Sequence, residues 1–269
     1  MSDPVLSRHL AAERIAAEAA TLALRHFHGR SDLAIEAKAT PQDIVSRADR
    51  EVEDLIRARV GRLFPDDGVL GEEGGAQAGT SGFTWVVDPI DGTSPFLAGL
   101  PHWCVAIAVL QDQETVLGVT NVPMAKEVFS ARKGAGLKLN GRLCRLDDRL
   151  RLDSCLTGIG ASHRSKPEDI VAVIRLLLEA GGALYRNGSG AAMLASVAAG
   201  RLGAYLELHM NAWDCLGGLL MVREAGGVTA PFCEDGDLSG GDRVVAAAPG
   251  VWPGIERLLV AYGSGSEVS

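Results

Sequence analysis

Asp88 and Asp91, two aspartates three residues apart, follow an apolar β-favouring stretch and are strong candidates for chemistry in this chain. The segment over residues 88–93 reads Asp-Pro-Ile-Asp-Gly-Thr. A tight turn can aim both carboxylates at one point, where they repel each other unless a cation lies between them. The spacing therefore predicts a metal site, and the turn exposes the carbonyl oxygen of Ile90 as a further ligand. The same residue types also suit an ordinary surface turn.

The residues after the second aspartate suit a phosphate group. Gly92 permits close backbone approach, and Thr93 and Ser94 could begin a helix whose N-terminus attracts anions. A metal ion and a phosphate group would then meet at one place.

Two further acidic stretches belong with this one. Glu72 and Glu73 lie on a glycine-flanked loop, and Asp214 follows Trp213 at the start of a glycine-rich apolar segment. Magnesium takes hard oxygen ligands, so a few carboxylates and a substrate phosphate are sufficient for a site. The predicted metal ligands are Glu72, Asp88, Asp91, Asp214 and the carbonyl of Ile90.

Together these stretches resemble the inositol monophosphatase family of magnesium-dependent, lithium-sensitive phosphatases. Its W-x-x-D-P-x-D-G-T and W-D-x-x-x-G patterns stand at residues 85–93 and 213–218, and G-R-x-x-A-Y-x-E ends at Glu207. The likeness runs from about Lys38 to about Val228. Two departures are Ser94-Pro95, where relatives carry threonine or lysine followed by asparagine, and Asn211, where many carry histidine.

The resemblance implies an α/β (α+β) fold, a layered αβαβα sandwich as in inositol monophosphatase and fructose-1,6-bisphosphatase. Residues 1–150 would hold a helix pair, an antiparallel sheet and the metal-binding motifs. Residues 151–269 would form a mixed α/β half with the substrate pocket, and both halves would make one compact unit. A homodimer is also implied.

The implied activity is Mg²⁺-dependent hydrolysis of myo-inositol monophosphate or a related sugar phosphate, by in-line attack of a metal-bound water. Two or three Mg²⁺ ions would assist this reaction, and Li⁺ would inhibit it. Thr93 and Asp49 would orient or deprotonate the water, and Glu72 is both ligand and catalytic residue. Glu73 would support Glu72, and Lys38 matches a basic residue near the metals.

The leaving group is expected to bind in the second half. Glu207 matches a hydroxyl-binding glutamate of the family, and a carboxylate and an amide suit a polyol. Asn211 is equally well explained as a helix N-cap. The predicted substrate-binding residues are Gly92, Thr93, Ser94, Gly188, Ser189, Glu207, Asn211 and Asp214.

Three other functions stay open. The segment Gly99-Leu100-Pro101 also occurs in some histidinol-phosphate phosphatases of the family, and a bisphosphate nucleotidase is a further alternative. One bacterial branch of the family also works as a non-catalytic partner of the transcription machinery. The intact carboxylate set favours catalysis.

Patterning predicts the elements that position these residues. Apolar residues at helical spacing indicate helices over 5–27 and 40–63, the latter beginning at Thr40-Pro41. Strands are expected at 83–87, where Pro89 ends the pairing, and at 103–110, 115–122 and 127–131, with a hairpin at Asn140-Gly141. The second half alternates segments at 156–159, 168–180, 183–185, 191–199, 204–208, 212–225, 243–248 and 255–261, before a frayed tail at 263–269.

The composition of the chain argues against several classes of function and location. A formal charge of −8 argues against direct nucleic-acid binding, which needs clustered Lys and Arg. The five cysteines include no C-x-x-C pair, which fits a reduced, cytoplasmic protein. No secretory leader and no apolar run long enough for a membrane span are recognised. The 33 glycines suggest tight turns and close backbone packing.

Overall fold

The structure, a computed structural model, describes residues 3–30, 35–37, 44–234 and 236–266. Its α-helices are α1 (Pro4–His28), α2 (Arg47–Leu63), α3 (Thr93–Leu97), α4 (Pro167–Glu179), α5 (Gly190–Ala198), α6 (Ala212–Glu224) and α7 (Trp252–Ser266). Two short 3-10 helices are η2 (Pro123–Ala125) and η3 (Leu152–Ser154). None of the helices in these ranges combines the length and the apolarity that crossing a membrane requires.

The larger sheet carries the first half of the chain. Its eight strands lie in the order β10-β9-β8-β7-β6-β5-β3-β4, and every neighbouring pair is antiparallel except β3 and β5. The predicted antiparallel meander and the Asn140-Gly141 hairpin are confirmed. The strands are β3 (Gly68–Gly71), β4 (Gly75–Gln77), β5 (Phe83–Asp91), β6 (Cys104–Gln111), β7 (Glu114–Val122), β8 (Glu127–Arg132), β9 (Gly136–Leu139) and β10 (Arg142–Cys144).

The smaller sheet carries the second half and has the order β12-β11-β13-β15-β14. Strand β11 is parallel to both β12 and β13, whereas the other pairs are antiparallel. Its strands are β11 (Leu156–Ile159), β12 (Ala183–Tyr185), β13 (Ala204–Met210), β14 (Val228–Thr229) and β15 (Asp242–Ala247). A separate pair, β1 (Ile35–Ala37) and β2 (Ile44–Ser46), is antiparallel.

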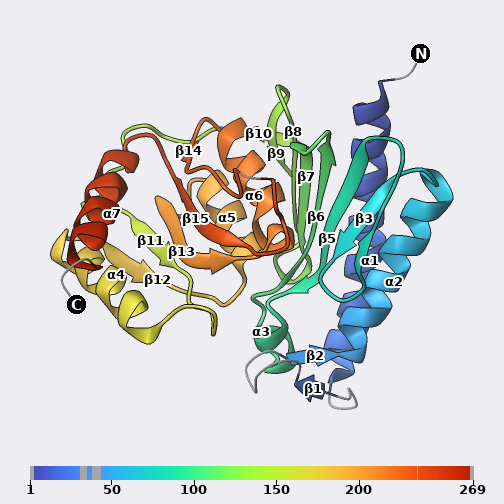
Figure 1. Cartoon of the computed structure of the whole chain (residues 1–269), viewed down its shortest axis with the longest axis horizontal. Coiled ribbons are helices and arrows are strands. Elements are labelled where there is room, and N and C mark those ends of the chain that lie inside the picture. The colour runs from blue at the N-terminus through green and yellow to red at the C-terminus, as the bar shows by residue number, and fades with distance from the viewer. Residues whose placement is uncertain (1–2, 31–34, 38–43, 235, 267–269) are drawn as a thin grey trace.

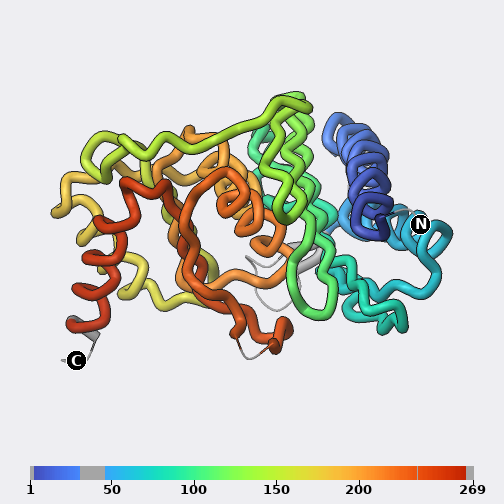
Figure 2. Tube along the Cα trace, turned by 90° about the horizontal axis from the view of Figure 1, so that it is seen from above, coloured from blue at the N-terminus to red at the C-terminus, as the bar shows by residue number. Residues whose placement is uncertain are grey.

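The helices and sheets form five layers, as Figure 1 shows. Helices α1 and α2 cover one face of the larger sheet, α5 and α6 lie between the two sheets, and α4 and α7 cover the outer face of the smaller sheet. This is the predicted αβαβα sandwich. Helices α1 and α7 lie at opposite ends of the molecule (Figure 2). Because α6 contacts both sheets, we propose that the predicted halves, 1–150 and 151–269, form one compact unit.

Buried side chains fill each space between the layers. Ile15 of α1 and Ile107 of β6 belong to one buried cluster, Leu194 of α5 and Leu219 of α6 to a second, and Ile255 of α7 to a third. Strand β5 is buried along almost its whole length, which explains its continuous apolar run.

Two glycines allow α6 to approach the larger sheet closely. A Cβ atom on Gly118 of β7 would lie 2.7 Å from the Cα of Gly217 on α6. Any larger residue at position 118 would force the helix away from the sheet. The expected close backbone packing is therefore present here.

The predicted start of the second helix is wrong. Thr40-Pro41 lies outside the described residues, and the chain forms β2 before α2 begins at Arg47. The Ser46 hydroxyl accepts a hydrogen bond from the Ala48 amide at 3.1 Å, and the Asp49 carboxylate accepts one from the Ser46 amide at 2.9 Å. This reciprocal capping box supplies partners for backbone donors at the helix start and sets it at this point.

Two other predicted boundaries also differ. Pairing of β5 does not end at Pro89, because Asp88 pairs with Ala106 and Asp91 pairs with Cys104 across a register shift. A bulge accommodates a proline that cannot donate a ladder hydrogen bond. The chain from residue 263 is helical as far as Ser266 rather than frayed, and 267–269 lie outside the described residues.

Candidate active site

A cavity of about 720 Å³ opens where β5, α3, α5 and α6 meet the loops of the smaller sheet. Asp49 does not line this cavity, although it lies directly behind it. Lys38 lies outside the described residues. The predicted site residues that line the cavity are Glu72, Asp88, Ile90, Asp91, Gly92, Thr93, Ser94, Gly188, Ser189, Glu207, Asn211 and Asp214.

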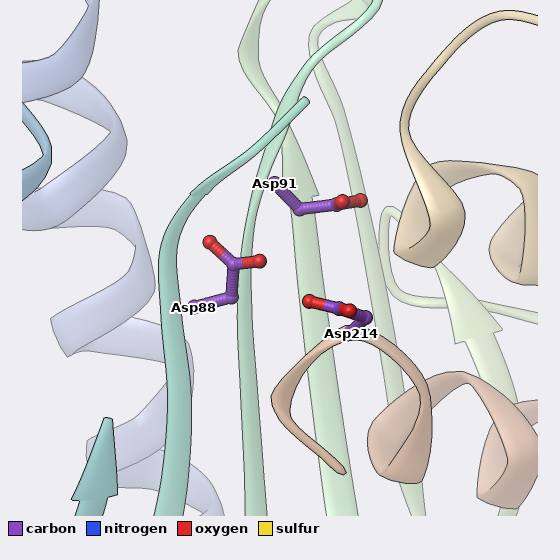
Figure 3. Close-up of side chains that lie close together, drawn as sticks. All are labelled: Asp88, Asp91 and Asp214. Carbon is purple, nitrogen blue, oxygen red and sulfur yellow. The ribbon is translucent and has the colours of Figure 1, made fainter. Parts of the chain in front are cut away.

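Three aspartates converge in this cavity. Asp88 and Asp91 come from β5, and Asp214 comes from the first turn of α6. One carboxylate oxygen of each lies within 4.8 Å of the others, and Figure 3 shows the three side chains pointing toward one another. Residues 126 positions apart in the chain therefore offer oxygen ligands to one point.

Burial raises the pKa of each of these aspartates. For Asp88 burial is the largest cause, and the charges of Glu72, Asp91 and Asp214 add to it, so its pKa lies well above its ordinary value. Burial raises the pKa of Asp91 against a lowering hydrogen bond from Ser189. Burial, followed by the charge of Asp91, raises the pKa of Asp214 to about 7. A cation would relieve the repulsion, so the donor set fits a divalent metal ion.

These pKa shifts predict how the metal-free protein responds to pH. An aspartate with a raised folded-state pKa holds its proton when the unfolded chain has lost it, so its contribution to stability falls as the pH rises. For Asp214 the loss runs from the ordinary value of 3.8 to about 7. In EDTA, wild type should lose stability relative to Asp214→Asn across this range, as measured by urea unfolding at several pH values. A difference between the two proteins that is independent of pH would contradict the buried, uncompensated charge.

The carboxylate of Asp91 also joins the two halves of the chain. It accepts hydrogen bonds from the Ser189 hydroxyl at 2.5 Å, the Ala191 amide at 2.7 Å and the Gly190 amide at 3.2 Å. These donors lie at the N-terminus of α5, where amide groups lack helical partners. Ser189, which was predicted to bind substrate, therefore donates a hydrogen bond to Asp91 and also lines the cavity.

Gly92 is required by the geometry beside the aspartates. Its φ of 92° is left-handed, and it precedes the first residue of α3. A Cβ atom here would lie 2.8 Å from the His102 carbonyl oxygen and 3.0 Å from the Ser189 Cβ. Only glycine fits both constraints, so the chain can turn directly from β5 into α3.

Thr93 connects the cavity to Asp49. Its hydroxyl lies 3.2 Å from a carboxylate oxygen of Asp49 and 3.3 Å from the Ile90 carbonyl oxygen. Asp49 is completely buried, and this burial raises its pKa, while hydrogen bonds from Ser46 and Thr93 lower it. Asp49 can thus act on a cavity group through the Thr93 hydroxyl.

Glu53, which the sequence interpretation did not select, holds the loop that carries Glu72. Its carboxylate is 2% exposed and accepts hydrogen bonds from the backbone amides of Glu73 and Gly74, both at 2.8 Å. Arg57, one turn later on α2, pairs with it at 2.7 Å. The spacing of Glu53 and Arg57 in the sequence predicts an ion pair on one helix face, but it does not indicate that Glu53 binds the distant loop that carries Glu72. Glu73, expected to support Glu72, contributes its backbone amide to this contact.

Glu207 and Asn211, from the second half of the chain, line the same cavity as the aspartates. Tyr205 donates a hydrogen bond to the Glu207 carboxylate, and burial raises the pKa of Glu207 to about 7. Asn211 is the N-cap residue of α6, and its backbone amide donates to Asp214 at 3.1 Å. The predicted N-cap position of Asn211 is confirmed, and its predicted contact with the substrate stays a prediction.

Basic residues that sequence reasoning missed also line the cavity. His102, His163, Arg164 and Arg186 come from three separate loops. No motif with a known function marks them, although His163 and Arg164 are adjacent, because they lie in irregular segments.

Comparisons with known proteins agree with this geometry. The model of the inositol monophosphatase family matches residues 6–262. The chain is 38% identical to "Nus factor SuhB" of Xylella fastidiosa over 81% of this chain and 80% of that protein. It is also 38% identical to "Inositol-1-monophosphatase" of Rhizobium meliloti over 76% and 77%. Among solved structures, the extragenic suppressor protein suhB of Bartonella henselae superposes with a TM-score of 0.86 at 32% identity, over 94% of this chain and 98% of that one.

Proposed function

The chain belongs to the inositol monophosphatase family and is a phosphatase, and we propose that it hydrolyses myo-inositol monophosphate or a related sugar phosphate with the aid of Mg²⁺. The observation that carries this proposal is the convergence of Asp88, Asp91 and Asp214 in one cavity, with the Thr93 hydroxyl beside them.

The side chains that would hold Mg²⁺ are the three aspartates and Glu72, with the carbonyl oxygen of Ile90. These are hard oxygen donors, as magnesium prefers, and they leave room for water and a substrate phosphate. Bound magnesium lowers the pKa of water and stabilises charge on the phosphoryl and leaving oxygens. We propose two or three ions, with inhibition by Li⁺ following from the family.

Thr93 and Asp49 would prepare the water. Asp49 accepts the hydrogen bond of the Thr93 hydroxyl, so the lone pairs of that oxygen face the cavity and can accept a proton from water. As Thr93 accepts that proton, its own hydroxyl proton would pass to the Asp49 carboxylate, with which it is hydrogen-bonded. The amides at the start of α3 and the residues Gly92 and Ser94 would orient the phosphate group.

Glu53→Gln should weaken metal binding without removing a metal ligand. The variant loses a carboxylate oxygen that holds the Glu72 loop, and partners of ligating groups typically affect metal affinity by about 10–100-fold. The Mg²⁺ concentration for half-maximal activity should rise by that factor, with a smaller change in kcat at saturation. Glu51→Gln, the same change at an exposed position of α2, is the control. An unchanged magnesium response would show that Glu53 does not position the loop.

The pocket suits a leaving group that carries hydroxyl groups. With a pKa of about 7, Glu207 can both donate to and accept from ring hydroxyls at neutral pH, and Asn211 can do the same. An ammonium group, as in histidinol phosphate, would instead bind the ionised form of this carboxylate and favour it. A site built to hydrogen-bond hydroxyl groups discriminates strongly against ligands that lack them.

Phosphate release from inositol 1-phosphate, histidinol phosphate and a nucleotide phosphate tests the proposal. We expect Mg²⁺-dependent release that is fastest with inositol 1-phosphate and that Glu207→Gln slows for this substrate. If histidinol phosphate is the better substrate and Glu207→Gln removes that reaction selectively, Glu207 is an ammonium site. Absence of release from all of them would overturn the proposed activity.

A non-catalytic role is the second candidate, because several relatives carry the name "Nus factor SuhB". Such a role would survive the loss of a metal ligand, whereas phosphatase activity would not. A strain that lacks the gene for this protein and grows poorly can be complemented with wild type or Asp214→Asn, which separates the catalytic role from the non-catalytic one. Growth restored equally by both would show that the essential role is not catalysis.

We further propose a cytoplasmic homodimer that binds small phosphorylated substrates rather than nucleic acid directly. The net charge of −8 supports the absence of direct nucleic-acid binding. The cytoplasmic location is supported by the five cysteines, which all lie in described residues and form no disulfide. Sedimentation equilibrium measures the oligomeric state.

A further inference from the structure

The cavity lies at the carboxyl edge of a parallel part of the smaller sheet. Strand β11 runs parallel to β12 and β13, so the ends of these three strands face the same way. Residues 160–164 follow β11, residues 186–190 follow β12, and both loops line the cavity. Loops in this position commonly bind the ligand of an α/β sheet.

Each of these two loops brings an arginine to the cavity. Arg164 follows β11 and Arg186 follows β12, and both line it while remaining exposed. Arg186 donates a hydrogen bond to the Ala161 carbonyl oxygen at 3.1 Å, which ties the two loops together. The guanidinium group of Arg164 has no hydrogen-bond or ion-pair partner within the part of the chain that the structure describes.

The two charges act on the substrate side of the site. Arg164 lowers the pKa of Asp214, and Arg186 lowers the pKa of Glu207, although burial dominates both shifts. By contrast, Arg201 and Arg57, which do not line this cavity, are paired with carboxylates. The unpaired donors of Arg164 and the remaining donors of Arg186 are therefore available to a ligand.

We propose that Arg164 and Arg186 form a subsite for a second phosphate group, so that the preferred substrates are polyol phosphates carrying a further phosphate on the leaving group. This inference rests on the proposed function, since it assigns the scissile phosphate to the aspartate cluster. A guanidinium group binds phosphate through two parallel hydrogen bonds, which a neutral polyol cannot match. The alternative role of the arginines is general attraction of anions, which does not depend on where the second charge lies.

The test compares myo-inositol 1-phosphate with myo-inositol 1,4-bisphosphate, which differ only in the second phosphate. We expect wild type to have the higher kcat/KM for the bisphosphate. Arg164→Gln and Arg186→Gln should each lower kcat/KM for the bisphosphate by about tenfold more than for the monophosphate, as expected for loss of a charged hydrogen bond to the second phosphate. Arg175→Gln, the same change on exposed α4, is the control.

Binding provides a readout without turnover. In the Thr93→Ala background with Mg²⁺, titration calorimetry should show tighter binding of the bisphosphate, lost on adding Arg164→Gln. Equal losses for both substrates, removed by high salt, would identify general attraction and overturn the subsite. Equal affinity for the two ligands would also overturn it. Failure of the proposed phosphatase would appear separately, as no phosphate release from either compound by wild type.

Discussion

Asp214→Asn should lower kcat/KM for phosphate release by about 10³-fold or more, while the protein remains folded. The variant keeps an oxygen that can accept from the Asn211 amide, so the capping box at the start of α6 survives. It loses the negative charge that Asp214 adds to the cluster with Asp88 and Asp91. Water bound to a metal ion is a stronger acid than free water, so weakening a ligand of that ion removes a large part of catalysis.

The measurement is phosphate release at saturating Mg²⁺ by purified protein of unchanged circular dichroism. Asp54→Asn, the same substitution at an exposed position of α2, is the control and should retain activity. Asp214 is the better test position than Asp91. An asparagine amide at 91 would face the donors of Ser189 and Ala191, so it would disturb the packing of α5 as well. Near-normal activity of Asp214→Asn would exclude the aspartate cluster as the metal site.

Thr93→Ala should lower kcat by about 10²–10⁴-fold with a small change in KM, the range that acid–base assistance contributes. The Thr93 hydroxyl is hydrogen-bonded to Asp49 and Thr93 lines the cavity, so alanine removes the hydrogen bond that joins this residue to the buried carboxylate. A residue that acts in the transition state changes kcat more than substrate affinity.

Steady-state kinetics on inositol 1-phosphate separates the two parameters. Thr93→Ser retains a hydroxyl in the same place and should recover much of the lost kcat. Asp49→Asn should resemble Thr93→Ala, because both break the same pair. A change confined to KM would assign Thr93 to phosphate binding instead.

Local patterns were sufficient for most of the elements. Alternation and turn residues identified β6 to β8 and the hairpin at Asn140-Gly141, because these depend on neighbours in sequence. Helical spacing identified α1 for the same reason. Prediction failed at Thr40-Pro41, where two helix-start signals competed and the reciprocal cap between Ser46 and Asp49 prevailed.

The acidic residues of the proposed metal site were also predicted from the sequence. Two carboxylates around a proline turn predict that their oxygens point to one place, where they can bind a cation. Gly92 has a left-handed φ, which explains why glycine follows the second aspartate. The sequence by itself therefore identified the acidic residues, and its resemblance to the inositol monophosphatase family implied the fold class and the kind of reaction.

Only the tertiary structure decided which distant residues meet these acids. Glu53 holds the Glu72 loop, Ser189 holds Asp91, and Arg164 and Arg186 reach the same cavity from two loops. Each contact joins segments that are remote in sequence, and it depends on how two sheets and the helices between them pack. Sequence periodicity reports only which face of an element is buried, so it cannot specify which side chains from different elements come into contact.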